Sequence, residues 1–246
     1  MKKVIVIGAS SGMGQRIASD FARVGCRVGM AARRKDRLEK IKERYPENTA
    51  VMEIDVTAED CVERFYKLIE LIDGMDILVF AAGCGYNDPD LDPTILQQTL
   101  QVNVVGFARI LAAAFRYYAQ TASDQPGQIA AITSVAATKG LGVAAAYSAS
   151  KRFQTTFIDA LEQLAYSRQV NVRFTDIRPG FVRTDLLDPA RDYPMTMSLD
   201  YVAPRIEEAI LRRRRRVVID SRWGVVTALW RLLPQRLWRH LNLTSL

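Results

Sequence analysis

The chain is poor in the residue types that most often hold metals or form disulfide frameworks. Its 246 residues include one histidine, His240, and three cysteines, Cys26, Cys61 and Cys84. One histidine argues against a metal site or a catalytic triad built on histidine. The cysteines are odd in number, far apart and without a C-x-x-C spacing, so we expect neither a disulfide framework nor a zinc site. No bound metal is expected.

Long hydrophobic runs are also missing. Only four apolar residues, 4–7, separate the two N-terminal lysines from Gly8, and that is too short for the core of a secretory signal peptide. No stretch approaches the ~20 apolar residues of a membrane-spanning helix. The hydrophobic content of 49% and the charged content of 25% are those of an ordinary globular protein. We therefore expect a cytoplasmic protein.

The net charge of +7 is unevenly distributed along the chain. Residues 1–211 carry 25 Lys and Arg against 26 Asp and Glu, whereas residues 212–246 carry nine Arg against Asp220 alone. The basic character therefore belongs to the C-terminal tail. No recognition motif accompanies this basic run, so we expect no nucleic acid partner.

Short apolar runs alternate with amphipathic segments along most of the chain. Apolar strands that are buried on both faces indicate a parallel sheet with helices on each side, so we expect one doubly wound α/β domain over residues 1–221. The predicted strands cover residues 3–7, 27–32, 50–54, 75–81, 128–133, 171–177 and 216–220. The predicted helices cover residues 12–24, 36–45, 58–72, 94–119 with a bend near Gly106, 147–167 and 200–211.

A glycine-rich turn separates the first predicted strand from the first predicted helix. Glycine permits positive φ and close approach of another backbone, and the helix N-terminus that follows presents unpaired N–H groups to an anion. A turn that needs its glycines only for geometry is the alternative. The position of the turn favours a pyrophosphate cradle. Its residues are Gly8, Ser10, Ser11, Gly12, Met13 and Gly14, with Ala9 between the first two.

The spacing of this turn, Gly-x-x-x-Gly-x-Gly, resembles that of the classical short-chain dehydrogenase/reductase family. The chain has Ile7 where that family has threonine. The resemblance covers residues 4–184, about three quarters of the chain. It implies a Rossmann-type domain with a seven-stranded parallel sheet in the order 3-2-1-4-5-6-7, and an oxidoreductase that uses a nicotinamide dinucleotide.

The end of the second predicted strand bears on the choice between NAD(H) and NADP(H). A carboxylate at this place usually binds a free ribose 2′-hydroxyl. The chain has Ala32 there, followed by Arg33 and Arg34. A guanidinium suits a 2′-phosphate, and arginines merely solvating a helix N-terminus would be unfavourably placed against its dipole. We therefore expect NADP(H) rather than NAD(H).

The resemblance implies further contacts with the dinucleotide. Asp55 would contact the adenine ring, although it could equally cap the next helix. Phe80 stands where the family has a polar residue that braces the sheet. The remaining contacts would come from Val56, Ala81, Ala82, Gly83, Tyr147, Lys151, Pro179, Gly180, Val182 and Thr184.

Four residues are candidates for the chemistry. Tyr147 and Lys151 lie four apart on one face of a predicted helix, and Ser134 follows the fifth strand. A phenol with a pKa near ~10 can serve as an acid or base near neutrality if a neighbouring ammonium lowers that pKa. The resemblance gives Ser134 the role of holding the substrate oxygen and Asn103 that of holding a water next to Lys151. It also implies an alcohol or ketone substrate.

Substrate selection is expected from three segments, residues 85–92, 139–146 and 186–199. An apolar pocket is suggested by their Leu, Met and aromatic residues, although ordinary packing would use the same residue types. The candidates are Leu141, Phe181, Leu186, Leu187, Tyr193 and either Met195 or Met197. No cationic side chain is evident that would hold a charged substrate, though Arg183 or Arg191 could reach such a position.

Residues 222–246 read as an amphipathic helical extension. Its Trp223, Val226, Trp230, Leu233 and Leu237 fall on one helical side, and Arg231, Arg236 and Arg239 on the other. Such a helix could cover the substrate pocket, form a homodimer or homotetramer contact, or lie on an anionic membrane.

Three functions remain open. The first is an NADP(H)-dependent alcohol/ketone oxidoreductase with Tyr147 as acid and base. The second is a catalytically idle dinucleotide-binding regulator or scaffold, against which the complete set of four reacting residues argues. The third is a lipid ketone reductase that works at a membrane surface.

Overall fold

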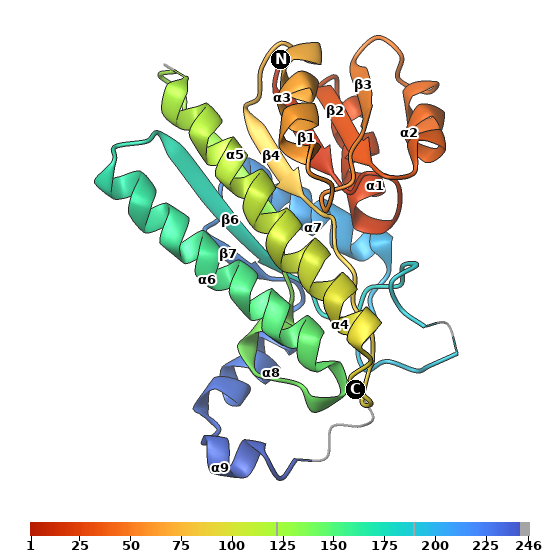
Figure 1. The fold of residues 1–246 in the computed structure, drawn as a ribbon, viewed down its shortest axis with the longest axis vertical. Coiled ribbons are helices and arrows are strands. Elements are labelled where there is room, and N and C mark those ends of the chain that lie inside the picture. Colours follow the sequence, from red (N-terminus) through yellow and green to blue (C-terminus); the bar gives the residue numbers. More distant parts are fainter. Residues whose placement is uncertain (122, 189, 242–246) are drawn as a thin grey trace.

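A seven-stranded parallel sheet in the order β3-β2-β1-β4-β5-β6-β7 forms the centre of the molecule (Figure 1). The computed structural model describes residues 1–121, 123–188 and 190–241. The sheet order and the parallel pairing confirm the prediction. The strands are β1 (Lys3–Ile7), β2 (Arg27–Ala32), β3 (Thr49–Glu53), β4 (Ile77–Phe80), β5 (Gly127–Ile132), β6 (Val172–Arg178) and β7 (Arg216–Val218).

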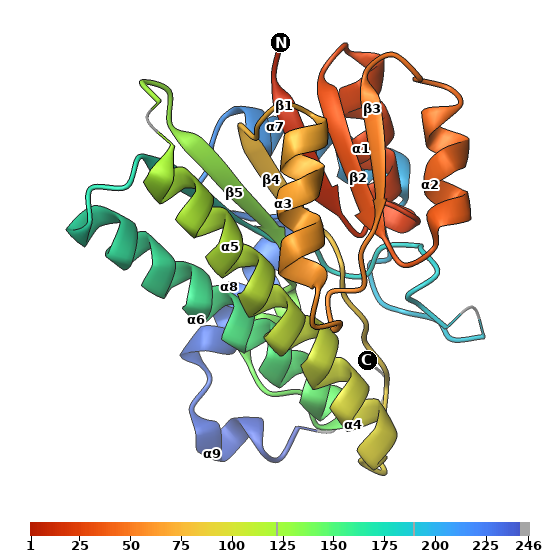
Figure 2. The same cartoon turned by 45° about the horizontal axis from the view of Figure 1, so that its top comes forward.

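Helices cover both faces of this sheet (Figures 1 and 2). One layer consists of α3 (Cys61–Leu71), α5 (Phe107–Gln120) and α6 (Ala145–Ser167). The other consists of α1 (Gly12–Arg23), α2 (Lys35–Lys42) and α7 (Leu199–Leu211). Helix α2 is shorter than the predicted 36–45, and α3 begins at Cys61 instead of 58 because residues 58–60 form a turn.

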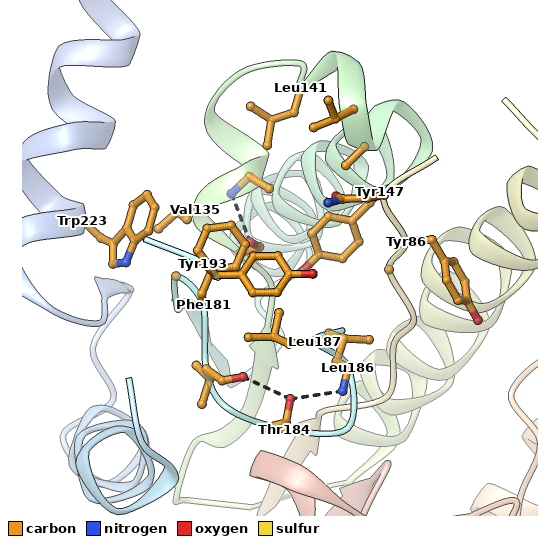
Figure 3. A pocket seen from close by; sticks show the side chains of 18 of the residues that line it. Tyr86, Val135, Leu141, Tyr147, Phe181, Thr184, Leu186, Leu187, Tyr193 and Trp223 are labelled. Carbon is orange, nitrogen blue, oxygen red and sulfur yellow. Dashed lines mark hydrogen bonds between the residues drawn. The ribbon is translucent and has the colours of Figure 1, made fainter. Parts of the chain in front are cut away.

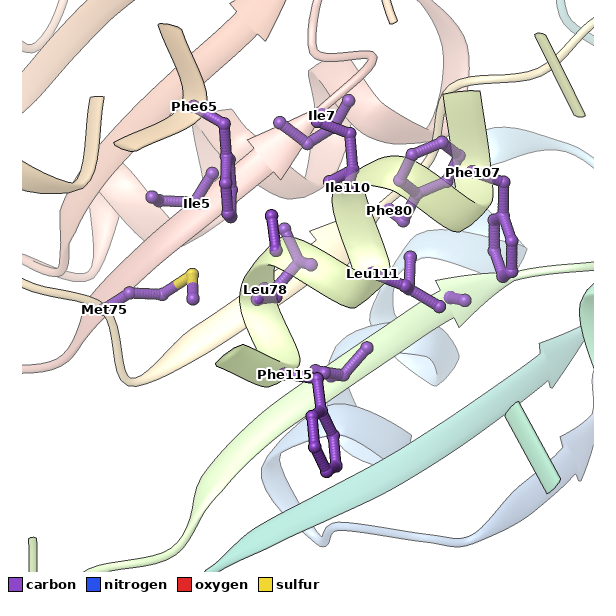
Figure 4. Close-up of a cluster of buried hydrophobic side chains, with 14 of the residues drawn as sticks. Ile5, Ile7, Phe65, Met75, Leu78, Phe80, Phe107, Ile110, Leu111 and Phe115 are labelled. Carbon is purple, nitrogen blue, oxygen red and sulfur yellow. The ribbon is translucent and has the colours of Figure 1, made fainter. Parts of the chain in front are cut away.

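Alternate side chains of each central strand enter opposite hydrophobic cores. In β1, Ile5 and Ile7 pack with α3 and α5, whereas Val4 and Val6 pack with the layer of α1 and α7. Figure 4 shows Ile5 and Ile7 beside side chains of β4, α3 and α5. Side chains alternate along a strand, so a strand covered on both faces has to be apolar throughout. This is why these strands read as continuous apolar runs.

The long helix after β4 widens where a bend was expected. Helix α4 (Pro93–Leu100) continues through a π-helical segment, Gln101–Gly106, into α5. A Cβ on Gly106 would lie 2.6 Å from Cγ2 of Val56, so the helix approaches the end of β3 closely only because this residue is glycine. Single π-helical turns are frequent at functional sites. Asn103 lies in this one.

The C-terminal tail forms two short helices that pack against the domain. They are α8 (Ser221–Leu232) and α9 (Gln235–Trp238). Strand β7 ends before the predicted residue 220, because Asp220 takes a φ of 76° and caps α8 by accepting from the Arg222 N–H. Residues 242–246 of the predicted extension lie outside the described residues.

The three tryptophans of the tail form an aromatic chain toward the centre of the molecule. Phe181 packs edge-on against Trp223, Trp223 against Trp230, and Trp230 against Trp238. Lys139 donates to the carbonyl of Leu233, and the Trp238 indole donates to the carbonyl of Gly140. The tail therefore packs on its own domain, which was one of the alternatives predicted for it.

The arginine run 212–216 is largely engaged in ion pairs with the domain. Arg215 pairs with Asp159 and Glu162, and Arg216 pairs with Asp159 and the buried Asp176. Arg212 pairs with Glu208 one turn earlier on α7. These pairs connect the start of β7 to α6 and β6.

In the described part of the chain, no helix is both long and apolar enough to cross a membrane. Nor does any group of three or more His, Cys, Asp or Glu side chains within residues 1–121, 123–188 and 190–241 have a geometry suited to a metal ion.

Two carboxyl groups meet where α1 packs on α7. Glu207 of α7 lies against Asp20 of α1, which is itself paired with Arg16 and Arg23. Burial and the adjacent Asp20 raise the pKa of Glu207 to about 7, whereas the pKa of Asp20 is lowered. A raised carboxyl pKa in the folded state adds stability below the unfolded pKa, and this stability is lost as the pH rises through the folded pKa.

We therefore expect Glu207→Gln, which mimics the protonated acid, to raise the melting temperature relative to wild type at pH 8 by a few degrees, or roughly 1 kcal/mol. The difference should shrink between pH 8 and pH 5, measured by thermal denaturation. Glu70→Gln, on the exposed side of α3, is the control and should show no such trend. A pH-independent effect of Glu207→Gln would contradict this interpretation.

Candidate active site

The glycine turn after β1 is built by close backbone packing. Gly8 has a φ of 90°, and its N–H donates to the Ala31 carbonyl of β2 over 2.8 Å. A Cβ on Gly8 would lie 2.5 Å from the backbone nitrogen of Ala82, and a Cβ on Gly14 would lie 2.3 Å from the Gly8 carbonyl oxygen. Only glycine therefore lets the turn, the start of α1 and the end of β4 meet.

A cavity of about 320 Å³ lies where these backbone segments meet, at the carboxyl ends of β1 to β4. This is the point where the strand order reverses, which is where open α/β sheets bind ligands. Most of the predicted cofactor residues line it. They are Gly8, Ser10, Ser11, Gly12, Met13, Gly14, Arg33, Arg34, Asp55, Val56, Ala81, Ala82, Gly83 and Thr184.

Two arginines give one end of this cavity its positive charge. Arg34 donates to the hydroxyls of Ser10 and Ser11, over 3.2 and 2.7 Å. Arg33 also lines the cavity, and no hydrogen bond or ion pair holds it within the described residues. Asp55 accepts from the N–H and hydroxyl of Thr57, so it caps a local turn, while Asp60 is the N-cap of α3.

Three of the four candidate reacting residues, Ser134, Tyr147 and Lys151, come from two neighbouring parts of the fold. Ser134 follows β5 and caps a short 3₁₀ turn by accepting from the Ala136 N–H over 3.1 Å. Tyr147 and Lys151 lie in the first two turns of α6, with Nζ of Lys151 5.6 Å from the centre of the Tyr147 ring. Lys151 is buried and donates to the carbonyl of Ile132 at the end of β5. The structure thus brings all three together.

Burial governs the ionisation of the tyrosine and lysine. It lowers the pKa of Lys151 to about 8. It also raises the pKa of Tyr147 above its ordinary value, and the Ser134 hydroxyl offsets this only in part. The net shift of the Tyr147 pKa is therefore upward in this structure, because loss of solvent around the phenolate outweighs the effect of the Ser134 hydroxyl.

Asn103 joins the π-helical segment to the other elements of the site. Its side-chain amide donates to the Cys84 carbonyl and the Ser150 hydroxyl, and its Oδ1 accepts from the Cys84 N–H. Its backbone carbonyl accepts from Gln154. A Cβ on Gly83 would lie 3.3 Å from Oδ1 of Asn103 and 3.5 Å from Nζ of Lys151, so both groups lie next to a residue that lines the first cavity.

A second cavity, of about 120 Å³, adjoins the hydroxyls of Ser134 and Tyr147. In Figure 3, Tyr147, Phe181 and Tyr193 surround this space and Trp223 lies at its far side. Five predicted substrate residues line it: Leu141, Phe181, Leu186, Leu187 and Tyr193.

Some of the predicted substrate contacts do not reach this cavity. Met197 is buried in the core and Met195 packs against the core, so neither of the two alternatives lines the cavity and both serve ordinary packing. Arg183 and Arg191 are not among the residues that line the cavity either.

Three further residues line the apolar cavity. They are Tyr86, which lies in the predicted substrate segment 85–92, and Trp223 and Trp230 of α8. The spacing of the tryptophans placed them on one side of a helix. Covering of the substrate pocket was one of the alternatives for this side, and these two tryptophans do line the cavity.

The two cavities adjoin. Met13, Tyr86, Thr184 and Leu186 line both of them. Of the other predicted cofactor residues, Tyr147, Gly180 and Val182 line the apolar cavity, whereas Lys151 and Pro179 line neither. The two cavities therefore adjoin at these four shared residues, and Tyr147 is part of the wall of the apolar one.

A buried ion pair behind the site was also not predicted. Arg178 donates to Asp176 over 2.6 Å, and both side chains are almost fully buried at the end of β6. The Thr133 hydroxyl donates to the same carboxylate. This network fixes the end of β5 directly before Ser134.

Comparison with known proteins identifies the family. A model described as short chain dehydrogenase matches residues 2–194. The chain belongs to this family. It is 31% identical to an uncharacterized oxidoreductase of Myxococcus xanthus over 244 residues, covering 96% of this chain and 94% of that protein.

Three further proteins are informative. A dehydrogenase/reductase family protein 7-like of Dictyostelium discoideum is 30% identical over 76% of this chain, which spans only 61% of that protein. A farnesol dehydrogenase of Aedes aegypti is 31% identical over 76% of this chain and 79% of that one. The alcohol dehydrogenase of Thermococcus sibiricus, solved with 5-hydroxy-NADP, has a TM-score of 0.76 at 25% identity, covering 91% and 97% of the two chains.

Gly85 sets the position of the Tyr147 ring. A Cβ at this residue would lie 2.6 Å from Cδ2 of Tyr147, so the ring packs directly on the glycine backbone. We expect Gly85→Ala to displace the ring and lower kcat by roughly 10-fold to 100-fold with little change in melting temperature. Gly142→Ala, where an added Cβ meets no atom within 4 Å, is the matched control. Equal kcat values for the two variants would refute this role of Gly85.

Proposed function

We propose that this protein is an NADP(H)-dependent oxidoreductase that interconverts an apolar alcohol and the corresponding ketone or aldehyde. The observation that carries the proposal is the placement of Tyr147 and Ser134 in the wall of an apolar cavity that adjoins a polar, arginine-bearing cavity. A protein that only bound a dinucleotide would need neither the second cavity nor a phenol aimed into it.

The polar cavity fits a dinucleotide phosphate. The backbone of the glycine turn leaves no room for a Cβ at Gly8 or Gly14, and α1 begins at Gly12 with its N–H groups toward the cavity end of the sheet. Arg33, Arg34 and Ser10 would hold a ribose 2′-phosphate, and Asp55 and Val56 the adenine. When bound, the nicotinamide of this dinucleotide supplies or accepts a hydride.

The residues of the site divide the remaining work among them. In the reducing direction, the Tyr147 hydroxyl donates a proton to the substrate oxygen, and the Ser134 hydroxyl holds that oxygen by a hydrogen bond. Lys151, held by the Ile132 carbonyl, stabilises the phenolate that remains. Asn103 positions the Cys84 segment against α6, and a water near it would return the proton from solvent to Tyr147 by way of Lys151.

The lining of the second cavity supports an apolar substrate. Leucines and aromatic side chains from the 180–193 segment and from α8 surround it. An apolar wall gains free energy by excluding water from an alkyl or isoprenoid chain. The similarity to a farnesol dehydrogenase agrees with this choice.

The reaction is tested with NADPH and a panel of apolar and polar ketones and aldehydes, followed by loss of NADPH absorbance. We expect apolar compounds to be preferred, and Tyr147→Phe to lower kcat by roughly 100-fold or more because the proton donor is lost. NADPH binding, measured by its fluorescence, should change little. Tyr166→Phe, at an 89% exposed position of the same helix, is the control. Turnover that survives Tyr147→Phe would refute the mechanism.

Cofactor choice is tested separately by Arg33→Ala. Loss of a charge-assisted bond to the 2′-phosphate should weaken NADPH binding by roughly 10-fold to 100-fold and leave NADH binding nearly unchanged. Lys35→Ala, at the exposed start of α2, should affect the two cofactors alike. A similar loss for NADH and NADPH in Arg33→Ala would show that Arg33 does not select the phosphate.

A further inference from the structure

Helix α8 is apolar on two opposite sides. Its inner side carries Trp223 and Trp230, which line the apolar cavity. Its outer side carries Val225, Leu229 and Leu232, which are 62%, 57% and 79% exposed. The spacing i, i+4, i+7 places these three side chains on one helix face. The sequence predicted apolar residues on one side of the helix and arginines on the other. The structure shows in addition three apolar side chains on the exposed side.

The exposed apolar surface is concentrated in the tail. Leu237 of α9 and Leu241 just after it are also exposed, by 57% and 46%. Five of the seventeen large exposed apolar side chains in the described part of the chain thus fall within residues 225–241. Single exposed leucines are normal on a protein surface, but such a concentration marks an interaction site. Figures 1 and 2 show α8 and α9 at one end of the molecule, outside the layers that cover the sheet.

The charge of this segment is of one sign. Residues 221–246 contain Arg222, Arg231, Arg236 and Arg239 and no acidic residue. Arg222 pairs with Asp220, which precedes the helix. The other three side chains are exposed. A partner for this surface has to offer apolar contact together with negative charge.

We propose that the outer side of α8 and α9, defined by Val225, Leu229, Leu232, Leu237 and Leu241, docks on an anionic lipid bilayer. Interfacial helices combine leucines that enter the acyl boundary with arginines that bind anionic headgroups. A second copy of this chain fits less well, because a two-fold contact would bring two arginine-bearing, acid-free surfaces together. The proposal concerns an interaction surface and does not depend on the reaction proposed above.

The position of the surface gives the docked state a defined geometry. An α-helix with its side chains is about 10–12 Å across, and the apolar cavity lies on the other side of this one helix. A docked bilayer would therefore lie one helix diameter from the cavity wall formed by Trp223 and Trp230.

The test is flotation of the full chain with vesicles of phosphatidylcholine, with and without phosphatidylserine. We expect binding to the anionic vesicles only, and a roughly ten-fold loss of binding in Leu229→Ser/Leu232→Ser. Leu71→Ser/Leu211→Ser, at positions 53% and 54% exposed elsewhere, is the matched control and should bind as wild type does. Neither Leu229 nor Leu232 lines either cavity, so turnover of a water-soluble carbonyl compound should be unchanged.

A second variant tests the charge. Arg236→Ser/Arg239→Ser should reduce flotation with anionic vesicles, and added salt should have a similar effect on wild type. Failure of wild type to float, or equal flotation of the leucine double variant, would overturn the proposal. The proposal would also be overturned if wild type sedimented as a dimer, the variant Leu229→Ser/Leu232→Ser sedimented as a monomer, and the two floated equally. The outer side would then bind a second copy of the chain.

Discussion

The covering of the sheet on both faces is the constraint on which the rest of the structure depends. Every residue of β4 and β5 is buried, so neither face of these strands offers room for a ligand or a charged group. Polar chemistry is therefore confined to the ends of the strands. At the carboxyl end, the contact between Gly8 and the Ala82 backbone brings the loops of β1 and β4 together, and both cavities open from this edge.

The features that could be predicted from the sequence involve residues that lie only a few positions apart in the chain. The glycines of residues 8–14 and the pair Tyr147 and Lys151 lie within single turns, so their geometry follows from local backbone rules. The buried pair of Asp176 and Arg178 could not be predicted, because two charges in a strand look like surface residues until the neighbouring strand is placed. The contact of Trp223 with the cavity depends likewise on where α8 lies after β7.

The pKa shifts of Tyr147 and Lys151 could not be predicted from the spacing of the two residues alone. A phenol and an ammonium four residues apart suggest a phenol of lowered pKa, but burial acts on both groups and disfavours the charged form of each. The pKa of Lys151 falls to about 8 and that of Tyr147 rises. In the proposed reaction, the protonated Tyr147 is the proton donor when a carbonyl group is reduced.

The tail helices form part of the cavity wall as well as part of the protein surface. A Cβ on Gly180 would lie 2.1 Å from the Trp223 indole nitrogen, so the segment after β6 and the tail helix are packed without a gap. Trp223 is part of the same hydrophobic core as α1 and α7. Helix α9 is bound through Trp238 to the Gly140 carbonyl, a few residues before Tyr147. A displacement of the tail would therefore be transmitted both to the cavity wall and to the segment that leads to Tyr147, which makes the tail helices a structural component of the apolar cavity.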